Sequence, residues 1–198
     1  MDELSYLSRP PGRTHGPLLD DLHALNRQFL DLLIEHEAVA DTAGLSSCTQ
    51  QSLHGLGPRE LERMATCPYS LFDLAFSEPA QWRRILNEPP QRGECPPTVA
   101  GAFALAALLY TRQLCQHHDG MARLLLGMTE DVLALLAAQD LPTLTACAFC
   151  CVPPLRARLA DHPHFWSDLV DFVRDGTRER QLAAHTLGMQ HSAAKFPR

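Results

Sequence analysis

Apolar residues recur at spacings of three and four along most of the chain, and no segment shows the sustained alternation of a half-buried strand. The first stripe lies on a helix that starts near Asp20 and runs to about Ala40. Residues 42–52 are small and polar, which predicts a loop or a frayed helix. Further helices are predicted from Pro58, at 69–77 and 77–86, and in several segments after residue 98. The pattern therefore predicts an all-α fold.

The order of signals is clearest over residues 108–149. A long helix is expected to run from residue 98 to a corner at Leu126-Gly127. A short helix should follow, because Thr129 can cap it and the acidic pair Glu130-Asp131 complements its first turn. Pro142 then begins another helix, since proline is tolerated in the first turn but not in the interior.

A similar order occurs earlier, which predicts an internal duplication. Gly57-Pro58 begins a short helix, Cys67-Pro68 interrupts it, and a helix over 69–77 follows. In this alignment Ser70-Leu71 and Ala75-Phe76 match Thr143-Leu144 and Ala148-Phe149 at a constant spacing, although chance similarity of two short amphipathic helices is an alternative. We expect two related helical modules packed together, with extra C-terminal helices at about 165–174 and 177–189. The predicted divisions are a flexible arm (1–17), a first module (18–87), a Pro-rich linker (88–97), a second module (98–190) and a tail (191–198).

Charge and cysteine content narrow the possible functions. The net charge of −6 disfavours a free-standing nucleic-acid binder, because affinity for DNA comes largely from neutralising phosphates. The apolar run at 101–110 is too short to span a bilayer and the N-terminus lacks the order of a secretory signal, so we expect a cytoplasmic protein without membrane contact. Seven cysteines, an odd number, fit reduced thiols. Lys195 is the only lysine, a usage typical of a GC-rich bacterial genome.

Cysteine and histidine residues in the second half raise the possibility of a zinc site. Cys147, Cys150 and Cys151 precede the pair His162 and His164, and zinc takes sulfur and imidazole ligands. These cysteines share one face of a helix rich in Ala, Leu and Phe, where a thiol behaves as a small buried hydrophobe. We expect core cysteines and no metal site.

No sequence motif indicates catalysis. A cysteine with His117 or His118 as its base is conceivable, but surface histidines at a helix end are the simpler interpretation. The chain has no Gly-rich phosphate loop, nucleophile elbow or paired-carboxylate motif. We therefore expect no catalytic residue, no cofactor and no enzymatic activity.

A helix-turn-helix is also poorly supported. The second helices of the two matching segments, 69–77 and 142–151, contain no basic residue with which to contact bases or phosphates. Basic residues gather later and are mixed with acidic ones, so an ordinary solvated surface is the alternative. The candidate DNA-proximal residues are Arg156, Arg158, Arg174, Arg178 and Arg180.

The helix that begins near Thr98 is the best candidate for an interface. Its N-terminal half is apolar on all sides, which is typical of a helix buried on several sides or held against another protein. Homo- or hetero-oligomerisation is expected through this face. The candidate interface residues are Ala102, Leu105, Ala106 and Leu109.

The order in 108–149 of Leu-Gly, an acidic pair, an apolar segment, Leu-Pro and an apolar helix resembles the flagellar transcriptional activator subunit FlhD. This resemblance implies an all-helical, dimeric subunit that activates transcription together with FlhC, a zinc-containing partner that makes much of the DNA contact. Family members usually have one module, so a tandem chain could mimic their dimer. The family's dimer-linking cysteine falls near Leu155, so that link does not transfer.

Taken with the acidic charge, the resemblance favours a cytosolic bacterial FlhD-like transcriptional regulator subunit. It would act through protein–protein association at a promoter, with an FlhC-like partner and with DNA only as part of a complex. The alternative is a helical adaptor or chaperone of a secretion or motility apparatus that does not bind DNA.

Overall fold

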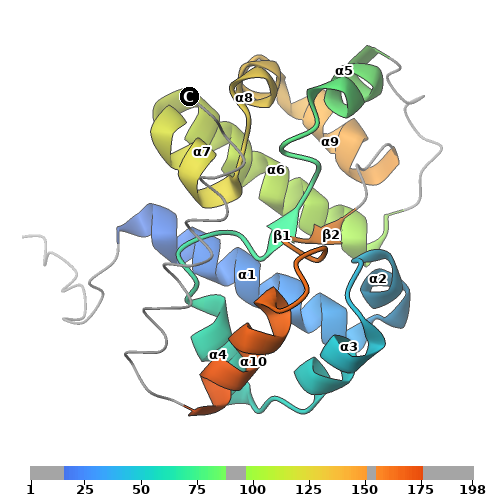
Figure 1. Cartoon of the computed structure of the whole chain (residues 1–198). Helices are drawn as coiled ribbons and strands as arrows, with labels where there is room; N and C mark the ends of the chain where they lie inside the picture. Colours follow the sequence, from blue (N-terminus) through green and yellow to red (C-terminus); the bar gives the residue numbers. More distant parts are fainter. Residues whose placement is uncertain (1–15, 88–96, 151–154, 176–198) are drawn as a thin grey trace, which may run out of the picture.

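The computed structural model describes residues 16–87, 97–150 and 155–175, and within these ranges it contains ten helices and one two-stranded sheet (Figure 1). The protein is mostly helical, as predicted, with a small sheet that was not predicted. The predicted helix at 177–189 and tail at 191–198 lie outside the described residues, as do most of the predicted arm and linker. The elements are α1 (Pro17–Glu35), α2 (Glu37–Thr42), α3 (Ser47–His54), α4 (Pro58–Ala65), β1 (Phe72–Asp73), α5 (Pro79–Asn87), α6 (Val99–His117), α7 (Asp119–Leu126), α8 (Glu130–Ala137), α9 (Leu141–Cys150), β2 (Arg156–Ala157) and α10 (Phe165–Asp175).

The predicted helix signals at the starts of α4 and α8 are confirmed. Pro58 occupies the first turn of α4, where Glu60 accepts a hydrogen bond of 2.7 Å from the backbone N–H of Gly57. The Thr129 hydroxyl accepts from the Val132 N–H at the start of α8, and Glu130 with Asp131 fills the first turn. Gly127 ends α7 in the left-handed conformation, with φ 66°.

The two longest helices end earlier than predicted. The first was expected to reach about Ala40, but α1 ends at Glu35 and α2 begins after His36. The second was expected to run to Leu126, but His118, with φ −149° and ψ 56°, separates α6 from α7. Within the segment predicted as a loop or frayed helix, α3 begins at Ser47, because the Ser46 hydroxyl accepts a bond from the Thr49 N–H.

The prediction of a helix over 69–77 is wrong. This segment is extended around β1, and its backbone groups bond to distant parts of the chain instead of to one another. The buried Asn26 side chain donates to the Tyr69 carbonyl at 2.9 Å and accepts from the Leu71 N–H at 2.8 Å. Ser70 N–H donates to the Leu125 carbonyl at 2.8 Å. These long-range bonds outweigh the local helical pattern, since a buried backbone group must find a partner.

The same order of elements occurs twice along the chain: four helices, a short strand and a further helix. The helices α1 and α6 both have 19 residues, and residue 17 corresponds to residue 99, a shift of 82. The same shift relates His36 to His118, the residues that end these two helices. Each is followed directly by a shorter helix, α2 or α7.

Corresponding residues after the fourth helix also make corresponding interactions. The Trp82 indole donates to the Leu74 carbonyl at 3.1 Å, and the Trp166 indole donates to the Arg158 carbonyl at 2.9 Å, so both pairs differ by 84 residues. The residues next to those two acceptors have φ of 54° (Ala75) and 56° (Leu159), values that non-glycine residues rarely adopt. The segment 71–76 therefore corresponds to 155–160. The predicted match of residues 70–76 to 143–149 is wrong, because 143–149 lies in α9, whose counterpart is α4.

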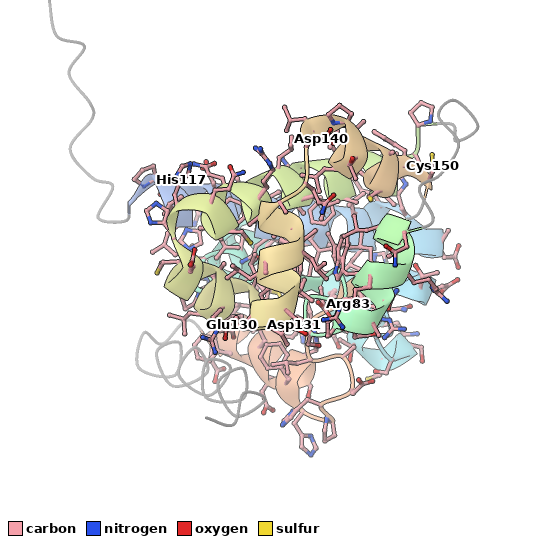
Figure 2. The ribbon with its side chains drawn as sticks, turned by 90° about the horizontal axis from the view of Figure 1, so that it is seen from above. Arg83, His117, Glu130, Asp131, Asp140 and Cys150 are labelled. Carbon is pink, nitrogen blue, oxygen red and sulfur yellow. The ribbon has the colours of Figure 1, made fainter. Side chains whose placement is uncertain are left out.

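The two halves are intertwined around an approximate twofold axis (Figure 1). At the centre α1 packs against α6, and β1 pairs antiparallel with β2, Phe72 with Ala157 and Asp73 with Arg156. The last helix of each half packs against the other half: α5 contacts α8, and α10 contacts α3 and α4. Arg83 of α5 forms an ion pair of 2.7 Å with Asp131 of α8 (Figure 2).

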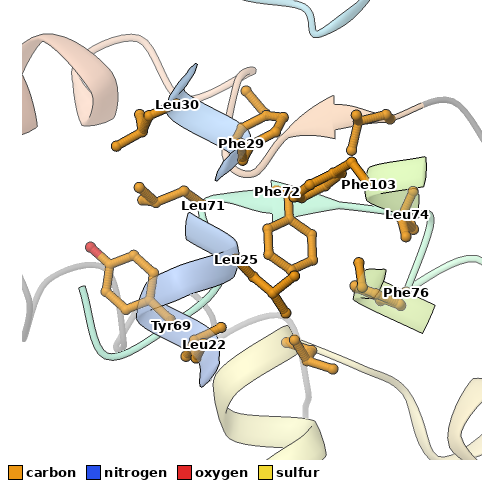
Figure 3. Packing of buried hydrophobic residues seen from close by; sticks show 14 of the residues in the cluster. Leu22, Leu25, Phe29, Leu30, Tyr69, Leu71, Phe72, Leu74, Phe76 and Phe103 are labelled. Carbon is orange, nitrogen blue, oxygen red and sulfur yellow. The ribbon is translucent and has the colours of Figure 1, made fainter. Parts of the chain in front are cut away.

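One hydrophobic core extends through both halves. Phe29, Phe72 and Phe103 pack together at its centre, with ring centroids 5.1 to 6.1 Å apart (Figure 3). Trp82 is fully buried. Neither half has its own separate core, because α1, β1 and α6 contribute one ring each.

Among the described helices, none is by itself long and apolar enough to cross a membrane. The pair α8 and α9 meets the length and composition criteria only when the two are taken together, and they are bent by 116° at the break between them.

Candidate protein-binding surface

One face of α6 leaves apolar side chains in solvent. Val99 is 54% exposed, Leu109 is 40% exposed, and Ala102 between them is also exposed. Of the four candidate interface residues, Ala102 and Leu109 are thus exposed, while Leu105 and Ala106 are half-buried. The other two large exposed apolar side chains of the described residues, Leu124 and Leu141, belong to separate helices. Apolar exposure at regular helical spacing is found on α6.

The opposite face of α6 belongs to the core. Phe103, Ala104, Ala107 and Leu108 are buried, and α1, α8 and α9 pack against the helix. The helix is apolar on all sides, then, because most of its circumference is covered by the protein itself. The exposed positions 99, 102, 106 and 109 form the remaining stripe, which we call the α6 stripe.

A groove of about 290 Å³ adjoins the N-terminal end of the α6 stripe. Its floor is apolar, since Leu32 and Phe103 are both buried. Polar groups of α1 line one side. The residues around it are Gln28, Asp31, Leu32, Glu35, His36, Val99, Ala102 and Phe103.

The α1 side of the groove carries negative charge. The Arg27 guanidinium lies 3.0 Å from the Asp31 carboxylate and 3.4 Å from Glu62, so one cation faces two carboxylates. Glu35, the last residue of α1, is exposed and adds a third carboxylate. The last turn of α1 has no basic residue to offset the partial negative charge of the helix end.

The approximate twofold axis relates this groove to the opposite end of the α1–α6 pair, which differs from it. There the Tyr110 hydroxyl donates to the Leu18 carbonyl at 3.0 Å and ties the start of α1 to α6. Burial raises the pKa of Tyr110, and the Asp21 carboxylate raises it further. The position of Tyr110 corresponds to that of Gln28, a polar side chain exposed at the rim of the groove.

The candidate DNA-proximal arginines do not form one patch. Arg156 lies 3.9 Å from the Glu78 carboxylate, and Arg174 donates to the Ser52 carbonyl at 3.2 Å. Arg178 and Arg180 lie outside the described residues.

Arg158 corrects the prediction made for it, because its side chain is buried. Its guanidinium donates to the Leu125 carbonyl at 2.6 Å and to the Ser70 hydroxyl at 3.0 Å, and it stacks on the Tyr69 ring. Burial lowers the pKa of Arg158 to about 10, although the Asp73 carboxylate opposes this shift. Arg158 remains protonated at neutral pH and joins the two halves, and it cannot reach a phosphate on the surface.

The cysteines lie mostly in the core. Cys147 is buried, as predicted, and Cys150 is half-buried, while Cys151 lies outside the described residues. Burial raises the pKa of the Cys115 thiol to about 12, which makes it a poor nucleophile for His117 or His118 to activate. Within the described ranges no three His, Cys, Asp or Glu side chains are grouped closely enough to hold a metal ion.

Sequence reasoning identified the α6 stripe but not the acidic side of the groove. Asp31 and Glu35 had no signal of their own, because they are ordinary polar positions of an amphipathic helix. Their role depends on the packing of α1 against α6. Comparisons with known proteins found no matching family model, no matching curated protein and no matching solved structure.

Proposed function

We propose that this chain is a non-enzymatic, FlhD-like transcriptional regulator subunit that acts in the cytoplasm through a protein partner at a promoter. The repeated order of elements around an approximate twofold axis is the observation that carries the proposal. An intertwined duplicated chain is what a single-chain counterpart of the FlhD dimer would require. The two related modules would then be the two subunits of such a dimer joined in one polypeptide.

The distribution of charge supports dependence on a partner. A net charge of −6 opposes tight binding to DNA, and the described candidate arginines are scattered, paired or buried. A partner with a basic surface, such as an FlhC-like protein, would supply the phosphate contacts. The exposed α6 stripe and its groove supply a place for such a partner to bind.

The proposal is tested by promoter occupancy in cells. Affinity purification of the chain under native conditions identifies its partner, and chromatin immunoprecipitation then measures occupancy with and without that partner. We expect discrete occupied sites that disappear when the partner is deleted. The isolated chain should bind DNA only weakly, with a Kd of roughly 10⁻⁶ M or higher at physiological salt. Absence of any enriched promoter would contradict the regulatory role.

The second candidate is a helical adaptor or chaperone of a secretion or motility apparatus. The α6 stripe favours it to the same degree, because an exposed apolar surface beside acidic residues suits a protein ligand and needs no DNA. Co-purification with a component of such an apparatus, together with no promoter enrichment, would favour this second function.

A further inference from the structure

We propose that the α6 stripe and the adjoining groove bind one amphipathic helix of a partner protein, whose apolar face is flanked by lysine or arginine. The inference rests on the proposed function only in that a protein partner exists, and it adds the chemistry and number of the binding site. Three independent features of the described residues support it: the spacing of the apolar side chains, the charge of the rim and the difference between the two ends of the α1–α6 pair.

The spacing of the exposed residues suits a helix. Positions 99, 102, 106 and 109 follow the spacing of three and four that helix-binding grooves present to an apolar ligand face. At 1.5 Å per residue the stripe is roughly 15 Å long, or about three turns. Ala102 and Ala106 lie in its middle, and their small side chains allow another helix axis to come close.

The rim selects the charge of the ligand. Asp31, Glu35 and Glu62 outnumber Arg27, so the α1 side of the groove has a net negative charge. A helix with basic residues beside its apolar face complements this rim. A second copy of the chain fits less well, since an isologous contact would bring two such acidic rims together.

The difference between the two ends predicts a single site. Shifted by 82 residues, the positions of Val99, Ala102, Ala106 and Leu109 fall on Pro17, Asp20, Ala24 and Arg27 of α1, which include two charged residues. At that end, moreover, Tyr110 bridges the two helices through its bond to Leu18. The approximate twofold symmetry therefore does not extend to this surface, and we expect one ligand helix per chain.

The experiment uses the full chain and two designed helical peptides of 18 residues. The first has leucine and alanine on one face and lysine on the flanks, and the second has glutamate in place of every lysine. Calorimetric titration at about 0.1 M salt should show 1:1 binding of the lysine peptide, at least tenfold tighter than the glutamate peptide. Ala102→Arg and Glu35→Lys should each weaken the lysine peptide about tenfold, with unchanged melting temperatures.

Ala24→Arg provides the matched control, because Ala24 is an exposed alanine on the related helix α1. Its binding should equal that of the unchanged protein. Equal affinity for both peptides, an equal loss with Ala24→Arg, or two peptides per chain would each overturn the proposal. Self-association that Ala102→Arg abolishes would instead identify a second copy as the occupant and would also overturn it.

The outcomes separate this inference from the proposed function. If the peptides fail but promoter occupancy still requires a partner, the groove assignment alone is wrong. If the lysine peptide binds as expected and no promoter is occupied, the regulatory role alone is wrong.

Discussion

Gly127 and Arg158 constrain each other at the contact between the two halves. Gly127 has φ 66°, and a Cβ atom added there would lie 2.5 Å from an Arg158 guanidinium nitrogen. Gly127→Ala should therefore lower the free energy of unfolding by about 1 kcal/mol or more, from backbone strain and displacement of the arginine. Urea denaturation at neutral pH measures this difference.

Gly120 supplies the control for that substitution. It lies in α7, and an added Cβ would have no neighbour within 4 Å. Gly120→Ala should be neutral or should raise the free energy of unfolding by up to about 1 kcal/mol, since alanine favours a helix. Equal effects at the two glycines would show that the Gly127 conformation has no special energetic role.

Cys67 should make the protein sensitive to alkali. Burial raises the pKa of its thiol to about 12 from 9.0, although the hydrogen bond with Tyr69 opposes the shift. Because the folded pKa is the higher one, this stabilisation is present below pH 9 and is lost as the pH rises toward 12. Between pH 9 and 10 the unfolded thiol ionises while the folded one stays protonated.

We expect Cys67→Ala to reduce the loss of stability between pH 9 and 10 by about 1 kcal/mol. Chemical denaturation of both proteins at the two pH values tests this, and each variant is compared with itself, so the cost of the lost side chain cancels. An identical loss in both proteins would mean that the Cys67 thiol does not titrate differently in the folded state.

The character of single residues could be predicted from the sequence only where the cause is local. Thr129 caps a helix and Gly127 ends one because of their immediate neighbours. Arg158 has acidic and polar neighbours in sequence, which suggested a surface position. Its burial depends on Ser70, Tyr69 and Leu125, all from other elements, and only the correspondence with Leu74 indicates an inward position.

At the scale of elements, a tryptophan fastens the last helix of each half to the strand segment that precedes it. Trp82 and Trp166 donate to corresponding carbonyls, at 3.1 and 2.9 Å, and both indoles are buried. Trp82→Phe and Trp166→Phe should each lower the free energy of unfolding by roughly 1–3 kcal/mol, because each leaves a buried carbonyl without its donor. Thermal denaturation of the two variants tests whether the losses are similar.

A loss at only one tryptophan would contradict the equivalence of the two segments. Trp82→His and Trp166→His extend the test, since an imidazole N–H can replace part of the indole bond. Partial recovery relative to phenylalanine at both positions would assign the loss to the hydrogen bond and not to the change in volume.

Helices with clear boundary residues were predictable, whereas the sheet was not. Pro58, Thr129 and Pro142 each mark a helix start through their own chemistry. The strands have two residues each and lack the alternation that reveals a longer strand. Their extended form is maintained by Asn26 and by pairing between segments 84 residues apart, which no local pattern contains.

At the scale of the whole molecule, the exchange of α5 and α10 makes the two halves one cooperative unit. Each half covers its partner with its last helix, and the core rings come from both. Differential scanning calorimetry should show a single transition whose calorimetric and van't Hoff enthalpies agree. Two separated transitions would mean that the halves unfold independently.

The duplication was visible in the sequence, but its register was not. Short amphipathic helices resemble one another, so the segment at 70–76 aligned with a part of α9 that is not its counterpart. The tryptophans at 82 and 166 carry the correct shift, and the intervening masked residues do not affect that spacing. The groove could not be predicted at all, because it exists only where the end of α1 meets the start of α6.

The intertwined arrangement also has a consequence for synthesis on the ribosome. When residue 87 has been added, α5 has been made, but α8 and its Asp131 have not. At about 5–20 residues per second, the nascent first half waits several seconds for the helix that covers it. During that interval Trp82 and its neighbours lack part of their final environment, so the newly made half is a natural client for a chaperone that binds apolar segments.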